Sequence, residues 1–113
     1  MAEMNKRMYI SLPIGDDDNF VKRQECFSWK IVKLLAKKGY IGVNPFNNGL
    51  ARESLRTSHL REDFKMLLSC DAILLCPGYE ISDGCQKELT LAVWSGIEVF
   101  KYDDFFTKKE TKD

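Results

Sequence analysis

Two carboxylates of this sequence have the spacing and surroundings that the cleavage of a glycosidic bond requires. Glu88 falls in the second turn of a predicted helix that begins at Ser82-Asp83-Gly84, about 60° from the face expected to be buried. Asp63 lies about 60° from the apolar stripe of the preceding predicted helix, with His59 one turn before it. One carboxylate could attack the sugar carbon while the other protonates the leaving group. On residue type alone, each could instead be an ordinary surface group, a solvated glutamate or one half of an ion pair.

Three other polar features allow both a functional and a structural interpretation. The helix start at Ser82-Asp83-Gly84 could hold a phosphate or another anion on its free N–H groups, or it could be a simple N-cap that Gln86 completes as a capping box. Tyr9 could serve packing alone, but its hydroxyl needs a partner if it is buried. The run Asp16-Asp17-Asp18 could bind a divalent ion, yet its spacing does not match a calcium loop and favours helix capping.

Alternating strands and helices would position these groups. Apolar runs predict strands at 8–12, 40–43, 71–76 and 97–100, and the run at 71–76 does not alternate, as in a strand covered on both faces. Periodic apolar residues predict helices over 20–38, 59–69 and 82–95, and a short helix is allowed at 50–55. The buried face of the helix at 59–69 is expected to carry Leu60, Phe64, Leu67 and Leu68. The polar tail at 107–113 is expected to be frayed.

This order of elements is typical of an α/β protein with a parallel sheet. Right-handed crossovers then favour a flavodoxin-like (Rossmann-like) three-layer sandwich with four to five parallel strands, in a single domain over residues 1–113. Ligands bind such sheets beyond the carboxyl ends of the strands. The candidate substrate-binding residues at that edge are Ser11, Pro13, Gly15, Gly78, Ser82, Asp83 and Gly84.

The composition narrows the classes of protein. The chain has 113 residues, 44% of them hydrophobic and 30% charged, which fits one folded domain. Its 17 basic and 17 acidic residues cancel, so an electrostatic binder of nucleic-acid polymers is not expected. The sequence has no apolar run of about 18 residues and no signal peptide pattern, which predicts no membrane span and a cytoplasmic location. A single histidine excludes a histidine-only metal cluster, and we predict neither a metal nor another cofactor.

Several short motifs, taken in order, resemble one known family. They are Tyr9-Ile10-Ser11-x-Pro13-Ile14-Gly15, Gly39-Tyr40, Val43-Asn44-Pro45, Asp63, Cys70-Asp71-Ala72-Ile73 and Pro77-Gly78-Tyr79-x-x-Ser82-x-Gly84-Cys85-x-x-Glu88. Together they extend over residues 8–100 and resemble the nucleoside 2-deoxyribosyltransferase-like family of small bacterial and phage domains. The order and spacing carry the resemblance, because no single motif is highly specific.

The resemblance implies a flavodoxin-like fold, a homodimer or homotetramer, and an enzyme that breaks the N-glycosidic bond of a nucleoside or nucleotide. Characterised relatives exchange nucleobases on deoxyribose or hydrolyse deoxynucleoside 5′-monophosphates. By position, Glu88 matches the nucleophile, Asp63 the aspartate that assists the leaving base, and Tyr9 the tyrosine that orients the glutamate. Ser82 and Gly84 match residues at the helix start, where the hydrolases hold the phosphate.

The sequence departs from the family pattern around the first loop and the helix start. Leu12 and Cys85 stand where family members often have Gly and Ala. The monophosphate hydrolases carry Ser and Arg in the first loop, at the places of Pro13 and Gly15 in this chain. Three aspartates follow here, and their charge would repel a phosphate.

Two tryptophans indicate self-association independently of the resemblance. Trp29 lies about 180° from Phe20 on its predicted helix, and Trp94 lies about 180° from Cys85, so both are placed on outward faces. There they could form an interface between copies, or each could pack under a loop of its own chain.

The sequence as a whole leaves three hypotheses about function. They are a glycosidase or deoxyribosyltransferase, a non-catalytic nucleotide or nucleotide-sugar binding module, and an oligomeric interaction protein without a small ligand.

Overall fold

Four parallel strands form the middle layer of the protein. The computed structural model describes residues 5–111 and orders the strands β2-β1-β3-β4. Their bounds are β1 (Lys6–Ser11), β2 (Tyr40–Val43), β3 (Ala72–Leu75) and β4 (Glu98–Lys101). Tyr9 of β1 is in register with Val43 on one side and Ile73 on the other, so β1 is hydrogen-bonded along both edges.

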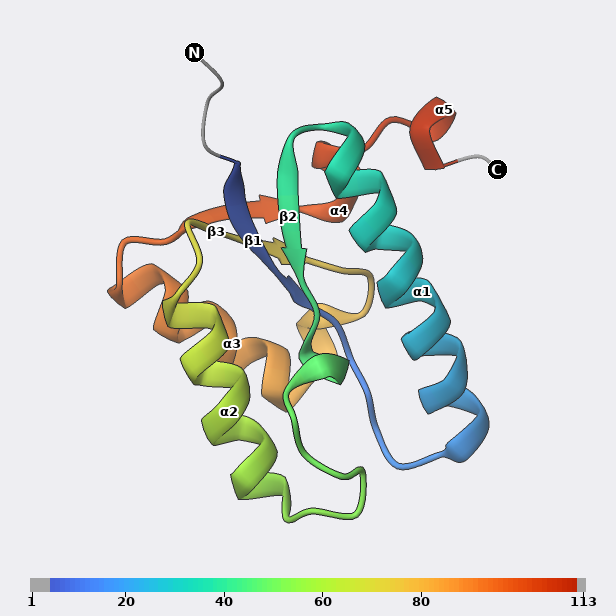
Figure 1. Cartoon of the computed structure of the whole chain (residues 1–113), viewed down its shortest axis with the longest axis vertical. Coiled ribbons are helices and arrows are strands. Elements are labelled where there is room, and N and C mark those ends of the chain that lie inside the picture. Colours follow the sequence, from blue (N-terminus) through green and yellow to red (C-terminus); the bar gives the residue numbers. More distant parts are fainter. Residues whose placement is uncertain (1–4, 112–113) are drawn as a thin grey trace.

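Helices cover both faces of this sheet, which makes the three layers that the sequence predicts. Figure 1 shows α1 (Asp18–Lys37) on one side and α2 (Arg56–Leu68) with α3 (Asp83–Trp94) on the other. Two 3₁₀ turns, η1 (Pro45–Asn47) and η2 (Tyr79–Ile81), precede α2 and α3. The predicted flavodoxin-like α/β fold is therefore confirmed, with four strands.

The alternation of side chains along the strands divides the core into two clusters. Met8 and Ile10 of β1 face α1, where they pack with Ile31 and Leu35. Tyr9, between them in the sequence, faces the opposite layer and packs with the cluster that contains Leu67 of α2 and Ala92 of α3. Every residue of β3 is buried, as expected of a strand covered on both faces.

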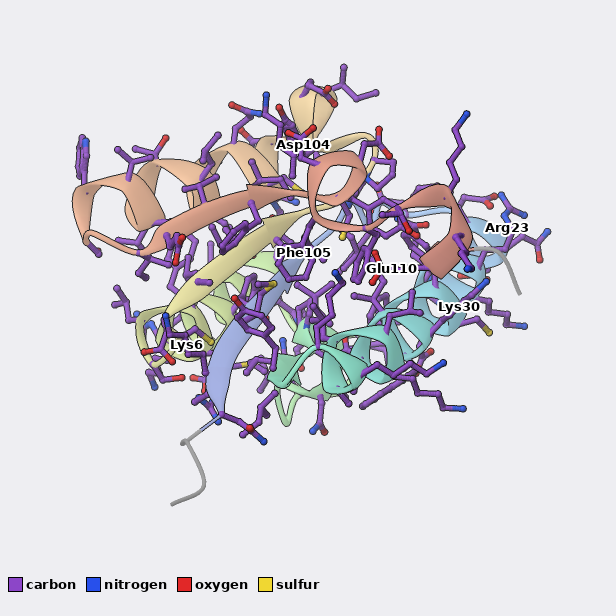
Figure 2. The ribbon with its side chains drawn as sticks, turned by 90° about the horizontal axis from the view of Figure 1, so that it is seen from above. Lys6, Arg23, Lys30, Asp104, Phe105 and Glu110 are labelled. Atoms are coloured by element: carbon purple, nitrogen blue, oxygen red, sulfur yellow. The ribbon has the colours of Figure 1, made fainter. Side chains whose placement is uncertain are left out.

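The segment after β4 packs against the side of the sheet that α1 covers. α4 (Tyr102–Phe105) places the ring of Phe105 with its centroid 5.0 Å from that of Phe100 and 5.4 Å from that of Tyr40. Figure 2 shows Phe105 between the strands and α1, whereas Lys6, Arg23 and Asp104 lie toward the periphery.

Part of the tail for which the sequence predicts fraying, residues 107–111, includes the short helix α5 (Lys108–Thr111). Thr107 and Glu110 form a reciprocal capping box: the Thr107 N–H donates to Oε1 of Glu110 at 2.8 Å, and the Glu110 N–H donates to Oγ1 of Thr107 at 3.1 Å. Oε2 of Glu110 also pairs with Nζ of Lys38, the C-cap residue of α1, at 2.9 Å. Residues 112 and 113 of the predicted tail lie outside the described part of the chain.

Two expectations about the middle of the chain are wrong. No helix forms at 50–55, and α2 begins at Arg56, three residues before the predicted start. Leu68 does not share the buried face of α2, because it follows Leu67 by one residue and thus points about 100° away from it. Its side chain is 54% exposed, whereas Leu67 is fully buried.

Both tryptophans lie on outward faces, as predicted. Trp29 is 42% exposed on α1, and Trp94 is 83% exposed on α3. Their contribution to an interface between copies stays a prediction. Across residues 5–111, no helix combines the length and the apolar character needed to cross a lipid bilayer.

Candidate active site

A cleft opens at the edge of the sheet where the strands end. Its volume is about 1090 Å³, and its walls come from the segments that follow β1, β2 and β3 together with the adjoining turns of α1, α2 and α3. Figure 1 shows the loops after β1 and β2 together at the lower end of the sheet. Of the predicted site residues, the following line this cleft: Pro13, Gly15, Asp63, Gly78, Ser82, Asp83, Gly84 and Glu88.

The Glu88 carboxylate is buried at this cleft and held by two hydroxyl groups. The Tyr9 hydroxyl donates to Oε2 at 2.7 Å, and the Ser11 hydroxyl donates to Oε1 at 2.7 Å. Tyr9 and Ser11 are two residues apart on β1, so both side chains project from the same face of the sheet toward α3. Both are fully buried and neither lines the cleft, so Ser11 is placed as a support of Glu88 and not at the surface where we predicted it to bind substrate.

Burial changes the acidity of the groups around Glu88. Removal from water raises the pKa of Glu88 from 4.5 to about 7, against the opposing effect of the hydrogen bonds from Ser11 and Tyr9. The negative charge of Asp63 adds to the increase. Burial and the neighbouring carboxylates also raise the pKa of Tyr9 well above 10, so its hydroxyl keeps its proton and remains a donor at neutral pH.

Asp63 occupies a second buried position in the wall of the cleft. Its side chain is 7% exposed, and its Oδ1 accepts a hydrogen bond from Nδ2 of Asn48 at 2.9 Å. Burial raises the pKa of Asp63 above its ordinary value, while Asn48 and His59 act in the opposite direction. The raised pKa favours the protonated form that a general acid needs.

Asn48 is a site residue that the sequence analysis missed. The same Nδ2 atom that contacts Asp63 lies 3.0 Å from Nδ1 of His59, so Asn48 bridges two side chains that lie one turn apart on α2. The asparagine is held in turn by its own loop, because Oδ1 accepts from the backbone N–H of Leu50 at 3.0 Å. Its position after β2, at the edge where ligands bind, was the available signal, but asparagine is also an ordinary turn residue.

The start of α3 is capped by a side chain. Oγ of Ser82 accepts from the backbone N–H of Cys85 at 3.3 Å. Gln86 does not complete a capping box, because it lies one residue too far along the helix, and its amide donates instead to the carbonyl of Tyr79 at 2.9 Å. Asp83 pairs with Lys87 and with Arg56, and these partners hold the pKa of Asp83 below its usual value, Lys87 having the larger effect.

The three aspartates after β1 lie at and just before the start of α1, and each has a different environment. Asp17 caps α1 by accepting from the Phe20 N–H at 2.8 Å, which confirms the capping prediction. Asp18 pairs with Arg52 at 2.5 Å, and Asp16 lines the cleft. Within residues 5–111, no three histidine, cysteine or acidic side chains come together in a way that could hold a metal ion.

A close approach of two loops fixes the shape of the cleft above Glu88. Gly78 has a φ of 91°, and a Cβ added to it would lie 3.1 Å from Cγ of Pro13. Glycine therefore suits this position on both counts, since it tolerates a positive φ and leaves room for the proline ring. The contact joins the loop after β1 to the loop after β3.

Replacing Glu88 by glutamine should stabilise the fold at alkaline pH. A raised pKa means that the folded protein binds the proton more tightly than the unfolded chain, so wild-type stability is complete below about pH 4.5 and is lost as the pH rises through about 7. The difference between 4.5 and about 7 corresponds to about 3 kcal/mol. Glutamine does not titrate, so Glu88→Gln should be more stable than wild type by about that amount at pH 9 and nearly equal to it at pH 4.

Urea denaturation at both pH values measures this difference in the free energy of unfolding. Glu80→Gln, at an exposed glutamate that does not line the cleft, is the matched control and should leave stability unchanged at both pH values. Equal stabilities of wild type and Glu88→Gln at pH 9 would show that Glu88 ionises without cost in the folded protein.

Several solved structures share this fold, including the following three. CMP N-glycosidase BcmB from Clostridium botulinum is 20% identical with a TM-score of 0.60, over 85% of this chain and 70% of that one. 2-Deoxyribosyltransferase from Bacillus psychrosaccharolyticus is 19% identical with a TM-score of 0.61, over 84% and 70%. 2-Deoxyribosyltransferase from Leishmania mexicana is 22% identical with a TM-score of 0.65, over 86% of this chain but only 63% of that one. At these identities the likeness establishes the fold alone.

No curated protein matches the sequence at a significant level. Residues 6–101, however, match the sequence profile of a family described as a domain of unknown function, DUF4406. This match covers most of the chain, and the solved structures confirm in the fold the resemblance that the motifs predict. The chain thus belongs to the DUF4406 family, and it has the fold of the nucleoside 2-deoxyribosyltransferases.

Proposed function

We propose that this protein cleaves the N-glycosidic bond of a nucleoside, with Glu88 as the nucleophile. The observation that carries the proposal is the environment of Glu88: a buried carboxylate that lines a large cleft, with each oxygen held by a hydroxyl group of β1. Two donors on a carboxylate fix its direction and partly oppose the effect of burial, which raises the pKa of Glu88 to about 7. Asp63, in the wall of the same cleft, supplies the second carboxyl group that such a reaction uses.

In the first step, a carboxylate oxygen of Glu88 attacks C1′ of the ribose or deoxyribose while the bond between C1′ and the base nitrogen breaks. The protonated Asp63 gives its proton to the departing base, which leaves as a neutral molecule. The products of this step are a glycosyl ester on Glu88, an ionised Asp63 and a free base.

In the second step, an acceptor attacks C1′ and the Glu88 carboxylate leaves. If the acceptor is water, Asp63 takes its proton and the free sugar is released. If the acceptor is a second nucleobase, a ring nitrogen of that base forms the new bond to C1′ while Asp63 takes a proton from the base at the position that it protonates in the first step, and the product is a nucleoside with an exchanged base. Both outcomes invert C1′ twice and therefore retain its configuration.

The activities named for the similar structures agree with this class of reaction. One is a CMP N-glycosidase and two are 2-deoxyribosyltransferases, so proteins with this fold act on the bond between a sugar and a base. The fold alone does not choose between water and a second base as the acceptor, and the experiment is designed to do so.

The experiment is base release followed by chromatography. Wild-type protein is incubated with a panel of nucleosides and deoxynucleosides, with and without a second free base. Release of the base without a second base identifies a hydrolase, and a new nucleoside that appears only with the second base identifies a transferase. No release from any member of the panel contradicts the proposal.

Nucleosides should be better substrates than their 5′-monophosphates. Asp16, Glu25 and Asp83 line the cleft, and the two arginines that line it are already paired, Arg52 with Asp18 and Arg56 with Asp83. A phosphate would have to break these pairs and approach the remaining carboxylates, so we expect kcat/KM for the nucleoside to be about tenfold higher or more. The same assay at low salt measures the ratio.

Asp16→Asn provides the test of the electrostatic cause. Because it removes one negative charge from the cleft, it should narrow the ratio between nucleoside and monophosphate. A wild-type protein that cleaves the monophosphate faster would contradict the prediction.

A further inference from the structure

His59 lines the cleft beside Asp63 and is the only histidine of the chain. Nδ2 of Asn48 lies 3.0 Å from Nδ1 of His59 and 2.9 Å from Oδ1 of Asp63. One amide nitrogen thus holds both side chains, which are one turn apart on α2. Nδ1 of His59 and Oδ1 of Asp63, which this nitrogen contacts, therefore lie close together in the wall of the cleft.

The orientation of the Asn48 amide is fixed by its other contact. Its Oδ1 lies 3.0 Å from the backbone nitrogen of Leu50, and a backbone N–H can only donate. The oxygen must therefore face Leu50, and the NH₂ group must face α2. The two hydrogens of that group are then shared between His59 and Asp63.

This orientation determines the tautomer of the histidine. An amide NH₂ group has no acceptor, so Nδ1 of His59 must accept the hydrogen bond and cannot itself carry a proton. A neutral imidazole has one N–H, which is then on Nε2. Within residues 5–111, no hydrogen-bond acceptor is found for Nε2, and the ring lines the cleft. A donor in that position is available to a ligand.

We propose that His59 determines base specificity in the reaction proposed above, by donating its Nε2–H to an acceptor of the nucleobase next to the atom that receives the proton of Asp63. Two donors side by side fit a base edge with two adjacent acceptors. Guanine and hypoxanthine present N7 and O6, and cytosine presents N3 and O2. Adenine has an amino group beside N7, and uracil and thymine have an N–H beside O2. Each of these bases would therefore place one of its own donors opposite one of the two protein donors, which is unfavourable.

The tautomer can be tested without any enzymatic activity. Nitrogen-15 NMR of the imidazole reads the protonated nitrogen directly, and the single histidine makes the assignment unambiguous. At a pH where the ring is neutral, the wild type should show the Nε2–H form, and Asn48→Ala should show a mixture of both forms. A wild-type protein with the proton on Nδ1 would overturn the inference.

The contact with the base is tested in the same spectra by adding free bases. Hypoxanthine and adenine differ at position 6, so hypoxanthine should shift the Nε2–H signal of His59 and adenine should not. Equal shifts, or no shift with either base, would overturn the inference. A shift with hypoxanthine in a protein that releases no base from any nucleoside would refute the proposed function and leave base recognition by His59 standing.

Kinetics give the third readout. We expect wild-type kcat/KM to be about tenfold higher for deoxyinosine than for deoxyadenosine, and His59→Phe to bring the ratio close to one by lowering the value for deoxyinosine. Arg61→Gln, on the exposed side of α2 and outside the cleft, is the control and should keep the wild-type ratio. An equal loss for both substrates in His59→Phe would indicate a structural role and contradict the proposal.

Discussion

Replacing Glu88 by glutamine should lower kcat/KM for base release by a factor on the order of 10⁴ or more. The amide has the shape of the carboxylate and can still contact the hydroxyls of Tyr9 and Ser11, but it cannot attack C1′. Chromatography of released base over long incubations measures the loss. Substrate binding should persist, because the rest of the cleft is unchanged, and a thermal shift with the same nucleoside detects it.

Two controls separate the chemistry from the folding. Since Glu88→Gln is expected to be more stable than wild type at neutral and alkaline pH, a loss of activity there cannot come from unfolding. Glu80→Gln, a change of the same type at an exposed position, should keep full activity. If Glu88→Gln releases base as fast as wild type, Glu88 is not the nucleophile.

Asp63→Asn should lower kcat/KM about 10³-fold for an ordinary purine nucleoside, because the departing base then receives no proton. Asparagine keeps an oxygen that can accept the hydrogen bond from Asn48, so the position should remain filled and bonded. A 7-methylguanine nucleoside should escape most of this loss. Its base already carries a positive charge and leaves as a neutral molecule without protonation. The ratio of the two substrates in wild type and variant measures the effect.

The dependence on the leaving group is what identifies an acid. If Asp63→Asn slowed both nucleosides equally, the residue would act by holding the structure or the sugar and not by protonating the base. Asp104→Asn, at an exposed aspartate of α4 outside the cleft, should leave both rates unchanged. Loss of binding as well as rate would point to a failure of the cleft wall around Asn48.

The helices and strands of the sheet layers could be predicted because the spacing of their apolar residues matches the period of a helix or a strand. The fully apolar run at β3 predicts a strand covered on both faces, and the apolar stripes of α1 and α3 predict helices that can cover it. The irregular parts could not be derived in this way. Residues 50–55 contain apolar and charged side chains that a helix would accept, but the backbone there follows Asn48, whose contacts with Leu50 and α2 hold a loop. The short helix α5 was not predicted because its segment is polar, although Thr107 and Glu110 have the spacing of a capping box.

Helical periodicity also allowed part of the candidate site to be predicted. Glu88 and Asp63 lie on helices, so their angles relative to the apolar stripes placed them near the buried faces. Their depth was underestimated, since both are less than a tenth exposed. The role of Ser11 could have been inferred from the alternation along β1, because it must share a face with Tyr9. Asn48 had no such periodicity, and only the folded loop brings it to His59.

The support of Glu88 comes from β1, one of the two inner strands that are paired along both edges, whereas much of the wall of the cleft comes from loops. Backbone hydrogen bonds of a central strand open only when most of a small protein unfolds, while loops open at little cost. The amide hydrogens of β1, whose Tyr9 and Ser11 hold the Glu88 carboxylate, should therefore be among the slowest of the molecule to exchange. For the reaction that we propose, we expect insertions and substitutions in the loops to change which nucleoside enters while the hydrogen bonds that hold Glu88 stay in place.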